Sequence, residues 1–176
     1  MIRLFGLAVV LLTWGFLTFQ SISIINQNIN GSKNKVETVQ KPSGRPQRLY
    51  IPKLSRIAAI SEGQIVDSRF VVSETGVSFW PSSAIPPNIG NSVIYGHNRA
   101  NILGGLPKVG RGDLLYVVLD NGQYVVYQIS ETKRVRPSQV EILNPSDDAR
   151  LTVYTCDGFK DRERFVIIGR LLKTSG

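Results

Sequence analysis

The chain has 176 residues, of which 42% are hydrophobic and 19% charged, with a formal net charge of +8 and a pI near 9.9. This composition excludes a disordered chain and leaves room for one folded domain with an appendage. A single cysteine excludes a fold stapled by intramolecular disulfides, and the scattered lysines and arginines, without a basic helix or an aromatic-basic motif, argue against a nucleic-acid partner.

Residues 1–25 begin with an apolar run from Leu4 to Phe19, which a weaker stretch extends to Ile25. About 22 helical residues span about 33 Å, enough to cross the core of a bilayer. Arg3 precedes the run, so the N-terminus is expected to be cytoplasmic and the bulk of the chain extracytoplasmic. A cleaved signal peptide is the alternative, but no clear small-x-small cleavage site follows. We therefore expect a single-pass anchor in the cell membrane.

Residues 26–47 are rich in Asn, Gln, Ser, Lys, Pro and Gly, which predicts a stalk. Residues 48–176 form the predicted catalytic domain, where short β-type runs alternate with Gly, Pro, Asn and Asp. The turn Asp120-Asn-Gly122 predicts a hairpin. Short helical segments are expected near 100–103 and 137–142. The candidate strands are 48–51, 57–60, 70–72, 92–95, 114–119, 124–129, 151–154 and 165–172, and their number and spacing predict a mainly β fold with a closed or nearly closed barrel.

The only cysteine, Cys156, and the only histidine, His97, both lie at the ends of predicted strands. Arg164 opens the last apolar run, eight residues after the cysteine. Acyl transfer through sulfur needs a thiolate, a proton shuttle and a group that holds developing negative charge. These three side chains make a cysteine-nucleophile enzyme the leading interpretation.

The order of the motifs resembles that of the sortases, the membrane-anchored cysteine transpeptidases of bacterial cell envelopes. After the anchor and stalk come Gly90-Asn-Ser-Val-Ile-Tyr-Gly-His97-Asn, Thr152-Val-Tyr-Thr-Cys156 and Arg164-Phe-Val-Ile-Ile-Gly. The family's cysteine motif is Thr-Leu-x-Thr-Cys, and Val153 replaces its leucine here. The resemblance covers roughly residues 48–173 and implies an eight-stranded sortase-like barrel.

The resemblance also implies residue roles. Cys156 attacks a carbonyl and forms a thioacyl intermediate, while His97 protonates the leaving amine and deprotonates the attacking one. Arg164 stabilises the oxyanion or positions the substrate, with Arg162 as the alternative. Thr155 and Asn98 are candidate substrate contacts, although Thr155 is equally explained by an ordinary strand hydrogen bond.

By the same resemblance, the substrates are surface proteins with a C-terminal LPXTG-like sorting signal, cut after its Thr. The acceptor is an amine of a cell-wall peptidoglycan precursor or a pilin lysine. Residues 130–150 are expected to shape the signal pocket, and residues 157–163 to border the acceptor side.

No cofactor is expected, and no second cysteine or histidine is present to bind zinc. Some sortases bind calcium, but the one acidic cluster in a plausible loop, Glu141, Asp147 and Asp148, has basic neighbours, so no calcium site is expected. Trp80 and Tyr95 are interpreted as core aromatics. Asp157 is not expected to act as a base, because a carboxylate beside the cysteine opposes thiolate formation.

Two other functions stay open. An L,D-transpeptidase-like cell-wall enzyme also pairs one cysteine with one histidine, but its Ser-x-Gly before the cysteine is absent. The other is an inactive, membrane-tethered binding module. A papain-like peptidase is disfavoured, because its cysteine precedes its histidine.

Overall fold

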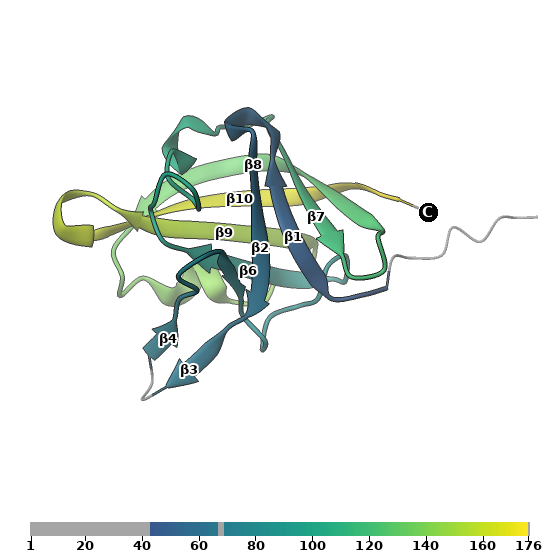
Figure 1. Ribbon diagram of the computed structural model, residues 1–176, viewed down its shortest axis with the longest axis horizontal. Helices are drawn as coiled ribbons and strands as arrows, with labels where there is room; N and C mark the ends of the chain where they lie inside the picture. The colour runs from purple at the N-terminus through teal and green to yellow at the C-terminus, as the bar shows by residue number, and fades with distance from the viewer. Residues whose placement is uncertain (1–42, 67–68, 176) are drawn as a thin grey trace, which may run out of the picture. The chain divides into compact units, whose positions relative to one another are not determined.

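The computed structural model describes residues 43–66 and 69–175 (Figure 1). The predicted anchor at residues 1–25 and most of the predicted stalk lie outside this part of the chain, so both stay predictions. Within the described ranges, no helix has the length and apolar character needed to span a bilayer.

Ten strands and four short 3-10 helices form from the described residues. The strands are β1 (Pro46–Ile51), β2 (Arg56–Glu62), β3 (Gln64–Val66), β4 (Arg69–Val71), β5 (Val77–Phe79), β6 (Gly90–Gly96), β7 (Leu114–Leu119), β8 (Tyr124–Val135), β9 (Ala149–Asp157) and β10 (Glu163–Thr174). The 3-10 helices are η1 (Pro52–Leu54), η2 (Leu106–Lys108), η3 (Val140–Leu143) and η4 (Phe159–Asp161).

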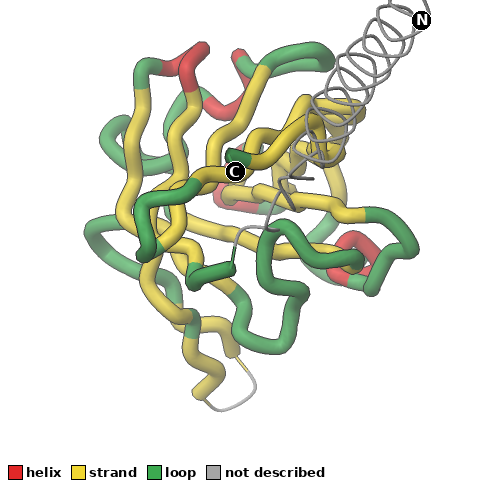
Figure 2. The backbone as a smooth tube through the Cα atoms, turned by 90° about the vertical axis from the view of Figure 1, so that its right-hand side faces the viewer, coloured by secondary structure: helices red, strands yellow, loops and turns green. Residues whose placement is uncertain are grey.

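Eight of these strands close into a barrel in the order β1-β2-β5-β6-β9-β10-β8-β7 (Figure 1). β3 and β4 pair separately, and Figure 2 shows them beside the barrel strands. The predicted mainly β fold and the closed eight-stranded barrel are therefore confirmed.

The barrel closes around one apolar core because its strands alternate between inward apolar and outward side chains. β7 is the clearest case, with Leu115, Val117 and Leu119 fully buried and their neighbours partly exposed. On β9, Leu151 and Val153 point into the same core. Most neighbours pair antiparallel, but β2 with β5 and β6 with β9 run parallel.

One predicted strand has a different place in the fold. The run at 70–72 was expected as one of eight strands in the barrel, but β4 pairs with β3 outside it. The eighth barrel strand is β5, which the sequence does not reveal because three residues are too few to display a period of two. Tertiary packing buries all three, including Ser78, whose hydroxyl accepts a hydrogen bond from the Ser73 N–H.

The ends of several elements also differ from those expected. β8 continues to Val135 rather than stopping at 129, because its last residues pair with β10 from Arg164 onward. β1 begins at Pro46, which pairs with Leu119 of β7. The hairpin at Asp120–Gly122 forms as predicted between β7 and β8. Residues 101–105 form turns rather than a helix, whereas η3 lies where a single turn was expected.

Candidate active site

Strand register brings the predicted site residues together from three strands. β9 and β10 pair antiparallel with Cys156 opposite Arg164, so their side chains share one face of the sheet. β6 and β9 pair parallel with Gly96 opposite Thr155. His97 directly follows Gly96, and Cys156 directly follows Thr155. The histidine and the cysteine therefore lie at the same end of these two parallel strands.

A cavity of about 320 Å³ opens at this point, and Cys156, His97 and Arg164 all line it. The other walls come from Phe70 of β4 and Val72 just after it, from Tyr95 and Tyr154, and from the segment between β8 and β9. We call residues 136–148 the β8–β9 segment. It is shorter than the loop expected at 130–150, because both ends of that range are strand.

Thr155 is buried, and its hydroxyl donates to the carbonyl of Gly96 at 2.8 Å. This hydrogen bond joins the residue before the cysteine to the residue before the histidine, and so fixes the spacing of the two strand ends. Asn98 is exposed and is not among the residues that line the cavity.

The two candidate arginines occupy different surroundings. Arg164 is half-buried, and its Nη1 donates to the carbonyls of Asp161 and Glu163, each at 2.9 Å. These bonds hold its guanidinium at the turn beside the cavity. Arg162 is exposed, with its guanidinium carbon 6.0 Å from the ring centroid of Phe159, and is not among the lining residues.

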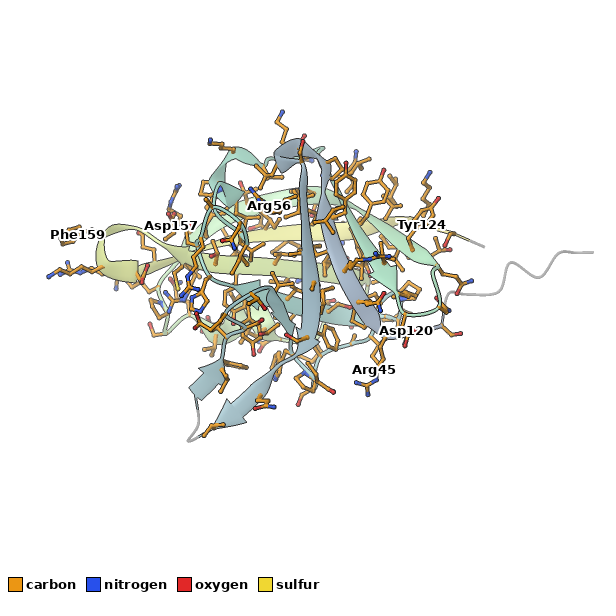
Figure 3. All side chains as sticks on the ribbon, in the orientation of Figure 1. Arg45, Arg56, Asp120, Tyr124, Asp157 and Phe159 are labelled. Carbon is orange, nitrogen blue, oxygen red and sulfur yellow. The ribbon has the colours of Figure 1, made fainter. Side chains whose placement is uncertain are left out.

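Asp157 follows the cysteine and, by the alternation of a strand, points to the opposite face of the sheet. Its carboxylate Oδ2 lies 2.7 Å from Nε of Arg134, whose guanidinium carbon lies 5.2 Å from the ring centroid of Phe165. Figure 3 shows Asp157 at the base of the β9–β10 hairpin and Phe159 at its tip. The carboxylate next to the thiol is thus paired with a cation.

Tyr95 and Tyr154 stack with ring centroids 5.6 Å apart and an interplanar angle of 16°. Tyr95 is buried, as expected of a core aromatic, yet it also lines the cavity. Burial raises the pKa of Tyr154 well above its ordinary value, so its phenol stays neutral beside Cys156 and Arg164. Trp80 instead packs edge-on against Phe70 and does not line the cavity.

Glu74 lies beside the histidine, and the sequence contains no signal for it. Its Oε1 lies 3.3 Å from Nε2 of His97, and its Oε2 lies 2.7 Å from Nη1 of Arg99. The hydrogen bond from Arg99 holds the pKa of Glu74 below its usual range, so the carboxylate is ionised at neutral pH. The histidine contact is within ion-pair distance but is not aligned as a hydrogen bond.

This arrangement predicts a pH effect at Glu74. The hydrogen bond from Arg99 is the largest cause of its lowered pKa, so Arg99→Gln should raise the pKa of Glu74 towards its usual range. The measurement is an NMR titration of the Glu74 carboxyl group in wild type and in the variant.

Arg45→Gln is the matched control, since Arg45 is an exposed arginine that pairs with Glu62 instead. It should leave the titration of Glu74 in place. A pKa of Glu74 that does not rise in Arg99→Gln contradicts control of this carboxylate by Arg99.

Metal-binding geometry is not found in the described part of the chain, where no three His, Cys, Asp or Glu side chains cluster. Of the acidic cluster Glu141, Asp147 and Asp148, the last residue forms ion pairs: Asp148 pairs with Arg150 at 3.4 Å and also with Arg170. Arg170 is exposed, at the far end of β10 from the cavity.

Comparison with known proteins gives consistent matches. The model of the sortase domain family matches residues 49–172. Sortase A of Listeria monocytogenes is 34% identical over 89 residues, which is 48% of this chain but only 40% of that relative. The match therefore spans less than half the length of this curated relative.

Solved structures show the same fold. The crystal structure of Listeria monocytogenes sortase A has a TM-score of 0.64 and 25% identity, covering 75% of this chain and 90% of that one. Streptococcus pneumoniae sortase C has a TM-score of 0.63 and 21% identity, covering 77% of this chain and 71% of that one. At that lower identity the likeness shows the fold alone. Because the family model matches residues 49–172, more than half of the chain, the chain belongs to the sortase family, whose members are cysteine transpeptidases.

Proposed function

We propose that this chain is a cysteine transpeptidase that cleaves a C-terminal LPXTG-like sorting signal of surface proteins and transfers the new acyl end to an amine. The observation that carries this proposal is that Cys156, His97 and Arg164 all line the same cavity. A nucleophile, a proton shuttle and a cation at one pocket are the groups that acyl transfer requires.

In the first half of the reaction, the thiolate of Cys156 attacks the carbonyl carbon of the signal's Thr. As the C–N bond breaks, His97 gives a proton to the leaving amine and a thioacyl intermediate forms. In the second half, an amine attacks the thioacyl carbon, His97 takes its proton, and the thiolate leaves.

Arg164 is proposed to hold the oxyanion that forms in each half. Its Nη1 donates to the turn carbonyls of Asp161 and Glu163. The remaining N–H groups of the guanidinium are then proposed to donate to the substrate. Arg164 is preferred to Arg162 for this role because Arg164 lines the cavity next to the thiol.

The sorting signal is proposed to bind against the apolar walls of the cavity. The apolar side chains suit the leucine and proline of such a signal: Val140, Ile142 and Leu143 of the β8–β9 segment, and Phe70 of β4. The connection between β9 and β10, residues 158–162, is proposed to border the acceptor side.

The acceptor amine is proposed to come from a peptidoglycan precursor or a pilin lysine. Residues 1–25 are proposed to anchor the chain in the cell membrane with the catalytic domain outside. The net charge of +8 supports attraction to an anionic membrane or cell wall.

The test uses the full chain in detergent micelles with a set of fluorogenic LPXTG-like peptides. Each peptide is incubated with no added amine, with a short peptide that has a free amino terminus, and with a lysine derivative, beside the Cys156→Ala control. Cleavage that depends on Cys156 and gives an amine-linked product supports the proposal and identifies the preferred amine.

Hydrolysis without an amine-linked product under any condition favours a cysteine peptidase. Absence of turnover together with a thiol that reacts no faster than free cysteine overturns the proposal in favour of a binding module.

A further inference from the structure

The β8–β9 segment forms one wall of the cavity, yet it is not a strand and needs something to fix its position. Its apolar side chain Ile142 packs on an outer cluster of Val135, Val166 and Ile168, against which Tyr154 also packs. Apolar contact is not directional, so it holds the segment near the barrel without fixing where each residue lies.

A directional attachment comes from Asn91 on β6, which is 3% exposed. Its side-chain amide donates to two backbone carbonyls of the segment, that of Ile142 at 2.9 Å and that of Asn144 at 3.1 Å. Its carbonyl oxygen accepts from the hydroxyl of Thr152 on β9 at 2.7 Å. Both amide protons therefore go to the segment, while the oxygen is held by the barrel.

The place of Asn91 in the fold gives these bonds a functional meaning. Asn91 lies six residues before His97 on β6, and Thr152 lies four residues before Cys156 on β9. The two strands that carry the reacting side chains thus also hold the wall of the cavity. A buried amide with all three bonds made is costly to disturb, because each lost bond leaves a partner unsatisfied.

We propose that Asn91 is a positioning residue that holds the β8–β9 segment in place as the wall of the signal pocket. The proposal rests on the proposed function and deepens it: Asn91 sets affinity for the sorting signal through the segment, without touching the substrate. The chemistry at Cys156 does not depend on it.

The test compares Asn91→Asp with Thr152→Val in the full chain. Asn91→Asp keeps the size and the acceptor for Thr152 but cannot donate to the segment when it is ionised. Thr152→Val removes only the bond on the barrel side. Asn91→Ala is the second variant, which removes both donors without adding a charge, and serves if Asn91→Asp does not fold.

Amide hydrogen exchange of the segment in the unliganded protein is the first measurement, and it needs no substrate. Asn91→Asp and Asn91→Ala should speed exchange there about tenfold, while Thr152→Val changes it less than threefold. Exchange that is unchanged in the Asn91 variants overturns the anchoring role.

Peptide kinetics and alkylation of Cys156 by iodoacetamide are the second measurement. The Asn91 variants should raise KM about three- to tenfold, with kcat and the alkylation rate within twofold of wild type. A loss of kcat and alkylation alongside KM means a general structural role and overturns the proposal. If wild type turns over no peptide and its thiol reacts no faster than free cysteine, the proposed function fails, while exchange still decides whether Asn91 anchors the segment.

Discussion

Replacing Cys156 with serine is expected to lower peptide turnover at least about 1,000-fold. A serine hydroxyl is nearly isosteric but stays protonated near neutral pH, and His97 is then required to remove its proton in the attack itself. The thiol needs no such help once it is ionised. The replacement of one atom should cause this large loss because the sulfur is the atom proposed to bond to the substrate.

The measurement is kcat/KM with the preferred peptide and amine, with thermal unfolding recorded alongside. Cys156 is only half-buried, so the variant should melt within a few degrees of wild type. Turnover within tenfold of wild type in a folded Cys156→Ser protein contradicts nucleophilic catalysis by this residue.

The second large effect is expected at the arginine. Arg164→Lys should lower kcat about 100-fold or more, because an ammonium cannot reproduce a planar fork that donates to the turn carbonyls and, as proposed, to the oxyanion. Its positive charge survives, so the loss measures the geometry of the donors rather than net charge.

Arg162→Lys is the matched control: Arg162 ends the connection between β9 and β10, two residues before Arg164, but it is exposed and does not line the cavity. It should leave kcat within twofold. The pair is measured by steady-state kinetics on the same peptide. Equal losses in the two variants, or a larger loss at Arg162, reject the assignment of the oxyanion role to Arg164.

Much of the fold can be predicted from the sequence, since the long strands show their own periodicity. β7 alternates cleanly between buried and exposed positions, and the Asp120–Gly122 turn joins it to β8. β5 could not be predicted, because a three-residue strand has no period and its pairing with β2 and β6 is a long-range choice. The end of β8 is also set by a long-range contact, because its last residues up to Val135 are strand only where they pair with β10.

The candidate site likewise contains residues that the sequence reveals and residues that only the tertiary structure reveals. Cys156, His97 and Arg164 are visible in the sequence because their residue types are rare or sit in motifs at strand ends. Asn98 stays a predicted substrate contact: it is exposed and is not among the residues that line the cavity. Glu74 and Asn91 act through contacts that cross the fold, so local patterns contain no signal for them.

The sequence by itself determined the mainly β barrel, the family and the three residues proposed for the chemistry, because strand periodicity and motif order are local properties of the chain. Only the tertiary structure decided which strand completes the barrel, which arginine faces the thiol and what surrounds the histidine. Those outcomes depend on strand register and on side chains far apart in sequence, which pairing brings to one end of the barrel.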